Sequence, residues 1–116
     1  MMPFHERRAV PRVRSYLPVR LYQLGKPVLE TLSKDIGGGG IRCVSSTLIP
    51  VGSEIRLEVP LPNGEPILNL RGKAAWFRIL PESDQFEVGI SFLDVTDRTK
   101  RLLSRYFESI QSVSHV

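Results

Sequence analysis

Cysteine and histidine are scarce in this sequence, and this scarcity limits its possible chemistry. The 116 residues include one cysteine, Cys43, and two histidines, His5 and His115, which lie near the two ends. A single thiol cannot form an internal disulfide, which is typical of proteins from a reducing compartment. Structural zinc sites use Cys and His ligands in groups of about four, so we expect no metal site.

Long apolar runs are also missing. No segment approaches the roughly 18 consecutive apolar residues of a membrane-spanning helix. Residues 1–25 contain no apolar block of the kind found in secretory signals. We therefore expect a cytoplasmic protein without a transmembrane segment. No Ser/His/Asp, Cys/His or paired-carboxylate pattern stands out, so we expect a binding protein and not an enzyme.

Positive charge is concentrated at one end of an otherwise ordinary composition. Apolar residues make up 41% of the chain and charged residues 24%, as expected for one soluble globular domain. The formal net charge is +4, and residues 1–20 account for it with five arginines against Glu6. Arginine offers a planar fork for phosphate and a flat face for stacking. A short arginine-rich segment on a neutral body favours a discrete anionic ligand over DNA.

The hydrophobic pattern predicts a mainly β fold after an N-terminal arm. Residues 1–15 lack helical or strand periodicity and contain Pro3 and Pro11, so we expect a flexible arginine-rich arm. Alternation of apolar and polar residues then indicates strands. The predicted strands cover residues 17–22, 28–33, 41–44, 54–59, 67–79 and 86–92. The pair Asn63-Gly64 predicts a hairpin turn, because both residues accept positive φ.

The C-terminal segment has a helical pattern. Apolar side chains recur there at spacings of three and four: Leu102, Leu103, Tyr106, Phe107, Ile110 and Val113. We expect a helix over about 96–113, with Thr96 or Asp97 as its N-cap. Residues 16–116 should therefore form one domain, a small antiparallel β-barrel of about six strands with a C-terminal helix packed against it.

Two motifs could carry a function. The first is Arg8-Ala9-Val10-Pro11-Arg12, preceded by Arg7. In an extended chain, residues at i and i+4 point the same way, so Arg8 and Arg12 could grip one ligand. A solvated basic tail is the alternative interpretation of this segment.

The second motif is Asp35-Ile36-Gly37-Gly38-Gly39-Gly40, between two predicted strands. Glycines let a ligand approach the backbone closely, and the Asp35 carboxylate suits the N1–H and N2–H₂ donors of guanine. The segment is not a P-loop or a dinucleotide fingerprint, because a strand and not a helix follows it. A glycine-rich β turn without a ligand is the alternative.

In this order the two motifs resemble the PilZ domain, the bacterial receptor module for cyclic di-GMP. The family pattern is R-x-x-x-R in an N-terminal arm, followed by [D/N]-x-S-x-x-G at a β turn. Three further segments resemble PilZ strands: Val51-Gly52-Ser53-Glu54-Ile55, Gly72-Lys73-Ala74-Ala75-Trp76 and Val88-Gly89-Ile90-Ser91-Phe92. The resemblance extends over nearly the whole chain, from about Glu6 to Phe107.

The resemblance implies a six-stranded antiparallel PilZ-type β-barrel that binds cyclic di-GMP and needs no other cofactor. The implied binding residues are Arg7, Arg8, Arg12, Asp35, Gly37, Gly38, Gly39 and Gly40. Arg8 and Arg12 would contact phosphates and guanines, and Asp35 would read a guanine. An arginine at the position of Arg7 goes with two intercalated ligand molecules per protomer. The arm would order over the barrel on binding and signal to an effector protein that the sequence does not identify.

One departure from the pattern keeps an alternative open. The serine of the family is Gly37 here, and the missing hydroxyl removes a hydrogen bond worth ~0.5–1.5 kcal/mol. A ligand-independent PilZ-like adaptor with a degenerate site is therefore the alternative function. A nucleic-acid-binding barrel is a third candidate, but it predicts a steep salt dependence that the neutral body does not favour.

Other conspicuous residues have simpler structural interpretations. Trp76 and Phe77 lie on a predicted strand and are interpreted as barrel core and rim. Cys43 lies among apolar residues and is interpreted as a buried small side chain. The basic residues of the predicted helix are interpreted as its solvated face: Arg98, Lys100, Arg101 and Arg105.

Overall fold

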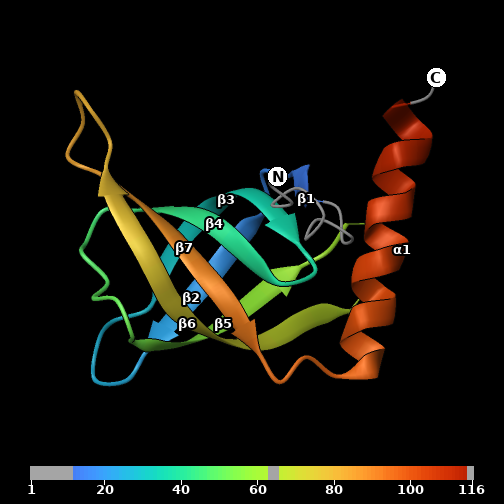
Figure 1. The fold of residues 1–116 in the computed structure, drawn as a ribbon, viewed down its shortest axis with the longest axis horizontal. Helices are drawn as coiled ribbons and strands as arrows, with labels where there is room; N and C mark the ends of the chain where they lie inside the picture. The colour runs from blue at the N-terminus through green and yellow to red at the C-terminus, as the bar shows by residue number, and fades with distance from the viewer. Residues whose placement is uncertain (1–11, 63–65, 115–116) are drawn as a thin grey trace, which may run out of the picture.

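The computed structural model describes residues 12–62 and 66–114, and for 12–14 and 111–114 only the backbone. Arg7, Arg8 and the predicted turn at Asn63-Gly64 therefore lie outside the described residues. Within them the chain forms seven strands and one helix (Figure 1). These are β1 (Arg12–Arg14), β2 (Pro18–Gln23), β3 (Leu29–Gly37), β4 (Gly40–Ser45), β5 (Glu54–Pro60), β6 (Ile67–Ile79), β7 (Phe86–Leu93) and α1 (Asp97–Ser114).

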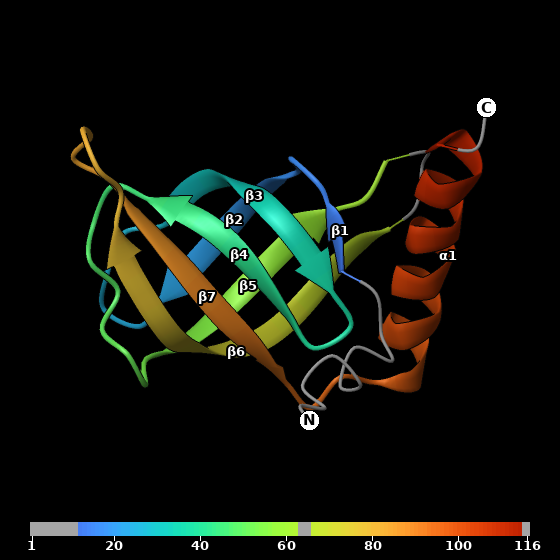
Figure 2. The same cartoon turned by 45° about the horizontal axis from the view of Figure 1, so that its top comes forward.

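Six of the strands close into an antiparallel barrel, as the sequence predicts. Around the barrel the order is β2, β3, β4, β7, β6 and β5, and β5 pairs with β2 to complete the circle. Because the barrel is closed, each of these six strands pairs with a neighbouring strand on both sides. Figure 2 shows the strands crossing the barrel obliquely, as a closed sheet requires.

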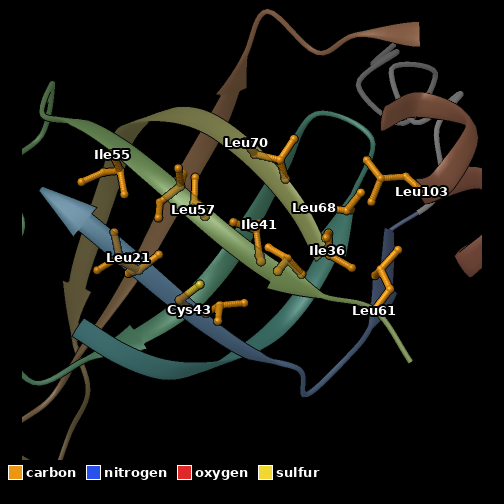
Figure 3. Close-up of a cluster of buried hydrophobic side chains, with 14 of the residues drawn as sticks. Leu21, Ile36, Ile41, Cys43, Ile55, Leu57, Leu61, Leu68, Leu70 and Leu103 are labelled. Atoms are coloured by element: carbon orange, nitrogen blue, oxygen red, sulfur yellow. The ribbon is translucent and has the colours of Figure 1, made fainter. Parts of the chain in front are cut away.

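The core fills the inside of the barrel because alternate residues of each strand point inward. On β5, for example, Ile55, Leu57 and Val59 are fully buried, and the charged residues between them face outward. Figure 3 shows Leu57 with Ile41 in this cluster. Cys43 is also buried there, and burial together with the charge of Asp35 raises the pKa of its thiol to about 12. The thiol is thus an apolar filler of the core, as predicted.

Helix α1 covers one end of the barrel (Figures 1 and 2). It begins after Thr96, whose hydroxyl oxygen accepts a hydrogen bond from the backbone N–H of Thr99 at 3.1 Å and so serves as the N-cap. Four residues of its predicted apolar stripe are buried, Leu102, Leu103, Tyr106 and Phe107, and Ile110 is partly buried. The side chain of Val113 lies outside the described part of the structure. No helical segment in the described ranges combines the length and hydropathy that a bilayer crossing needs.

The junction between β1 and β2 is tied to both β3 and α1. Ser15 is buried, and its backbone N–H donates to the carbonyl oxygen of Lys34 at 3.1 Å. The Ser33 hydroxyl donates to the backbone carbonyl of Ser15 and accepts from the backbone N–H of Leu17 at 3.0 Å. The Ser15 hydroxyl also contacts the Tyr106 hydroxyl of α1. These contacts hold residues 15–17 in place, where the chain passes from β1 to β2.

The structure differs from the sequence prediction around the glycines. Residues 12–14, predicted as part of an unstructured arm, form β1 and pair with the end of β3. Strand β3 continues beyond the predicted residue 33 to Gly37, so only Gly38 and Gly39 remain as the turn before β4. Pairing of β3 with β1 on one side and β4 on the other outweighs the low strand propensity of glycine.

Candidate functional site

The described part of the arm lies beside the glycine motif. In the β1–β3 ladder, Arg12 is opposite Gly37 and Arg14 is opposite Asp35. Two motifs that are distant in sequence are therefore adjacent along the same strand edge. Since β1 is antiparallel to β3, the chain before Arg12 leaves the ladder at the end where β3 turns toward β4. Arg7 and Arg8 lie outside the described residues, so their positions stay a prediction.

Next to this ladder the outer surface of the barrel is hollowed. The hollow has a volume of about 280 Å³ and lies over β3, β4, β6 and β7. Its lining includes Asp35, Gly39, Gly40, Arg42, Trp76 and Ser91. Small-molecule sites span roughly 300–1,000 Å³, so this hollow lies at the small end of that range.

Glycines make the floor of the hollow. A Cβ at Gly40 would lie 2.5 Å from the carbonyl oxygen of Ile90, and a Cβ at Gly89 would lie 2.2 Å from Trp76 Nε1. Neither position has room for a side chain. The backbone of β4 and β7 therefore forms the base of the hollow, and the indole of Trp76 lies directly over Gly89.

Trp76 is not a core residue, in contrast to its interpretation from sequence. The register of β6 against β7 shifts between Ala74 and Trp76. Ala74 pairs with Ile90 and Trp76 with the next residue, Gly89, so Ala75 is an extra residue without a partner on β7. Such a bulge reverses the inside–outside alternation of the strand. Ala74 is buried, whereas Trp76 is 42% exposed and lines the hollow. Phe77 is also exposed, and its ring meets Phe86 edge-on at 6.1 Å between centroids.

Asp35 is half of an ion pair at the edge of the hollow. Its Oδ2 lies 2.6 Å from Nη2 of Arg42, the residue directly opposite it on β4. The Asp35 side chain is 13% exposed and that of Arg42 is 34% exposed. Because the pair is largely shielded from water, its attraction is screened less than that of a surface pair.

A second carboxylate, Glu87, lies beneath three cationic side chains. It is 1% exposed although it points out of the barrel from β7. Arg78 Nε donates to Oε1 at 2.8 Å, Lys34 Nζ lies 3.2 Å from Oε2, and Arg42 Nη1 lies 3.7 Å from Oε1. These four side chains come from four neighbouring strands, so the network crosses the outer wall of the barrel beside the hollow.

The cations keep Glu87 ionised. Burial acts to raise the pKa of this carboxyl, but contacts from Arg78 and Lys34 and the charge of Arg42 outweigh burial. The pKa of Glu87 therefore lies below its usual range. With Asp35, the surface beside the hollow carries two carboxylates and three cations, which leaves it net positive and suited to an anionic ligand.

The structure brings the described residues of the two motifs together and adds residues that the sequence analysis missed. Asp35, Gly39 and Gly40 line the hollow, and Gly37 pairs with β1 next to it. Gly38 lies in the turn itself. Arg42 was missed, although its register opposite Asp35 follows once the turn is placed at Gly38 and Gly39. Glu87 lies at an outward-facing position of β7, and the three covering cationic side chains bury it.

The fold is thus a small closed β-barrel with an arginine-bearing strand beside a glycine-floored hollow. The profile of the PilZ domain family matches residues 6–109. The chain belongs to the PilZ domain family. No protein with a curated description matches the sequence.

Several solved structures have the same fold. The Bacillus subtilis inhibitor of motility MotI/DgrA superposes with a TM-score of 0.75 at 22% identity, over 96% of this chain and 56% of that one. Escherichia coli YcgR in complex with c-di-GMP gives 0.77 at 17% identity, over 94% of this chain and 48% of that one. The separate PilZ domain of YcgR with c-di-GMP gives 0.72 at 16%, over 93% and 94%. This chain thus spans about half the length of MotI and of intact YcgR.

Proposed function

We propose that this PilZ domain is a receptor for cyclic di-GMP. The observation that carries the proposal is the β1–β3 register, which sets Arg12 opposite Gly37 and Arg14 opposite Asp35, at the edge of a glycine-floored hollow. Membership of the PilZ family and the similarity of the fold to YcgR, whose structures contain c-di-GMP, support it.

The ligand chemistry matches the residues at this site. Cyclic di-GMP carries two phosphates and two guanines. Arg8 and Arg12 are proposed to bind phosphate oxygens and the O6 and N7 acceptors of guanine. Asp35 is proposed to accept hydrogen bonds from the N1–H and N2–H₂ of a guanine, and the backbone of Gly37, Gly38, Gly39 and Gly40 to approach the base closely.

The size of the hollow supports a role for the arm. At about 280 Å³ the hollow would hold part of the ligand and leave the remainder for the arm to contact. The segment before Arg12 leaves β1 at this edge and carries Arg7 and Arg8. We propose that phosphate charge and base stacking draw this arm over the ligand, and that the new surface contacts an effector protein.

A second candidate function is favoured by one residue. Where the family pattern has a serine, this chain has Gly37, and the missing hydroxyl weakens any ligand site. A ligand-independent adaptor that uses the barrel only for protein contact is the corresponding alternative. The two candidates differ in a single measurable property, which is ligand affinity.

Isothermal titration calorimetry of the whole chain tests the proposal. We expect binding of cyclic di-GMP in preference to cyclic di-AMP and GTP, because only cyclic di-GMP offers two guanine edges together with two bridging phosphates. Binding to none of the three would favour the adaptor function.

Arginine variants test the site itself. Charge-assisted hydrogen bonds contribute about 1.5–3 kcal/mol each, so Arg8→Ala and Arg12→Ala should each weaken binding at least about tenfold. Arg56→Ala is the matched control: Arg56 lies on β5 over the Tyr22 ring, outside the hollow, and its loss removes the same charge. Unchanged affinity in both arm variants would place the site elsewhere.

A further inference from the structure

The outer side of helix α1 carries a cluster of positive charge. Between Asp97 and Glu108 the helix has four basic residues and no acidic one, and all four basic side chains are exposed: Arg98, Lys100, Arg101 and Arg105. The other side of the helix contributes apolar side chains to the core, so the cations face away from the barrel that α1 covers in Figures 1 and 2.

The cations of α1 differ from most of those on the barrel in their pairing. On the barrel strands, cationic side chains lie close to carboxylates: Arg20, Lys34, Arg42, Arg56, Arg71 and Arg78. Within the described part of the chain, Arg98, Lys100 and Arg101 have no carboxylate partner. Their charge is therefore not neutralised by the fold and is available to a second molecule.

Two open hollows give this charged face its shape. One has a volume of about 310 Å³ and is lined by Pro66, just before β6, and by Arg98, Arg101, Leu102 and Arg105. The other has a volume of about 350 Å³ and is lined by Lys100, Arg101, Ser104, Arg105 and Glu108. Arg101 lines both hollows, so it lies between two depressions that can receive the side chains of a bound chain.

We propose that this face of α1 is a docking surface for an acidic, extended segment of a partner protein. Charge complementarity carries the proposal, since the face offers unpaired cations and no acidic residue between 97 and 108. Arg98 and Arg101 are three residues apart, or about 4.5 Å along the helix axis. Alternate side chains of an extended chain point the same way about 6.6 Å apart, a difference that long arginine side chains can span.

Two other anionic partners fit this face less well. Helices that lie in a lipid surface insert large apolar side chains, whereas the exposed large apolar residues of the described structure include none from α1. Nucleic-acid binding usually uses a basic face that extends over the fold, whereas the barrel beside α1 has most of its cations paired. The face is also separate from the glycine-floored hollow, whose lining includes no residue of α1.

Fluorescence anisotropy of the whole chain with a labelled peptide tests this surface. The probe is a peptide of about ten residues in which glutamate alternates with serine, so that its carboxylates share one side of an extended chain. We expect this peptide to bind at low salt and the corresponding glutamine–serine peptide to show no binding, because only the first carries negative charge.

Arg98→Glu combined with Arg101→Glu should weaken binding of the acidic peptide at least about tenfold, because each reversal replaces an attraction with a repulsion. Arginine and glutamate have similar helix propensities, so circular dichroism should show an intact α1. Arg98→Gln combined with Arg101→Gln removes the charges without adding repulsion and should weaken binding about threefold or more.

Arg7→Glu combined with Arg8→Glu is the matched control, because it makes the same charge change in the N-terminal arm. We expect it to change the affinity by less than about threefold. An equal or greater loss in the arm variant than in the α1 variant would overturn the proposal, as would absence of peptide binding by the wild-type chain.

Vesicles containing phosphatidylglycerol and a DNA duplex complete the comparison. Tighter binding to either one than to the peptide, lost on reversal of Arg98 and Arg101, would overturn the assignment to a protein segment. No sample contains cyclic di-GMP, so these results and those for the receptor function are independent.

Discussion

At the scale of single residues, Gly37 is the position where this chain departs most clearly from the PilZ pattern. The structure removes one obstacle to a side chain there. Gly37 ends β3 in the β ladder, and among the described glycines only Gly25 and Gly52 have positive φ. The backbone of Gly37 is therefore one that an L-residue can adopt without strain.

Gly37→Ser should consequently tighten the binding of cyclic di-GMP. The hydroxyl adds a hydrogen bond of ~0.5–1.5 kcal/mol, and the lower freedom of the unliganded chain adds about 0.5–1 kcal/mol. Together they predict a roughly threefold to thirtyfold gain, measured by calorimetry.

Gly39→Ser is the matched control for Gly37→Ser. Its Cβ meets nothing within 4 Å, so it reduces chain freedom without supplying a hydroxyl at the family position. We expect it to gain at most about fivefold. Weaker binding by Gly37→Ser with an intact circular dichroism spectrum would show that this glycine is required as such.

At the scale of elements, β6 and β7 cooperate to expose the indole of Trp76. The bulge at Ala75 turns Trp76 outward, and the absence of a side chain at Gly89 lets the ring lie against β7. In Gly89→Ala the new Cβ would lie 2.2 Å from Trp76 Nε1, so the ring must move away from the barrel.

The predicted result for Gly89→Ala is a red shift of tryptophan fluorescence and a loss of about 1–3 kcal/mol in unfolding free energy. Trp76 is the single tryptophan of the chain, so the emission reports this site alone. Gly39→Ala, which meets nothing within 4 Å, should leave the emission unchanged and cause no loss of unfolding free energy. Identical emission from Gly89→Ala and the wild type would contradict the contact.

The arm gives a prediction at the same scale. If cyclic di-GMP draws residues 1–11 onto the barrel, trypsin should cut after Arg7 and Arg8 in the free protein and much more slowly at saturating ligand. Arg7 further predicts two ligand molecules per protomer. Mass spectrometry of the digests and a calorimetric titration measure these two properties. Equal cleavage with and without ligand, or one ligand per chain, would each contradict the corresponding expectation.

Local alternation predicts most of the elements, and distant pairing explains the rest. The range 67–79 of β6 and the alternation of β5 and β7 are visible in the sequence. In the structure β5 and residues 67–74 of β6 alternate between exposed and more buried positions, whereas residues 87–90 of β7 are all buried. Strand β1 is not visible, since three residues have no pattern without their partner on β3. The bulge that exposes Trp76 depends on the register with β7, which no local signal in Ala74-Ala75 reveals.

The sequence predicts the motif residues of the candidate site but not the ion pairs around Glu87. Asp35 and the glycines follow from their own sequence. Burial of Glu87 depends on long side chains from three other strands, so it appears only once the barrel closes.

At the scale of the whole molecule, the Glu87 network makes stability depend on pH. The pKa of Glu87 is lowered in the folded state, so its charge stabilises the fold above the unfolded-state pKa of about 4.3. That contribution is lost as the pH falls through the lower folded-state pKa. Glu87→Gln should therefore be less stable than the wild type by about 1–3 kcal/mol at pH 7, with a difference that shrinks in acid.

Denaturant unfolding at pH 7 and at pH 3 measures this difference for Glu87→Gln. Glu30→Gln provides the control, because Glu30 is an exposed carboxylate paired only with exposed Arg20 in the described structure. Exposed pairs contribute ~0–1 kcal/mol, so this variant should track the wild type at both pH values. Equal stability of Glu87→Gln and the wild type at pH 7 would show that the network contributes nothing to folding.

Ser15 connects the barrel with the C-terminal helix. Its backbone is bonded to β3 on one side, and its hydroxyl meets Tyr106 of α1 on the other. Ser15 thus connects the strand that carries Asp35 with the helix that covers one end of the barrel. A displacement of Ser15 would therefore strain contacts to both elements, although α1 itself does not line the hollow.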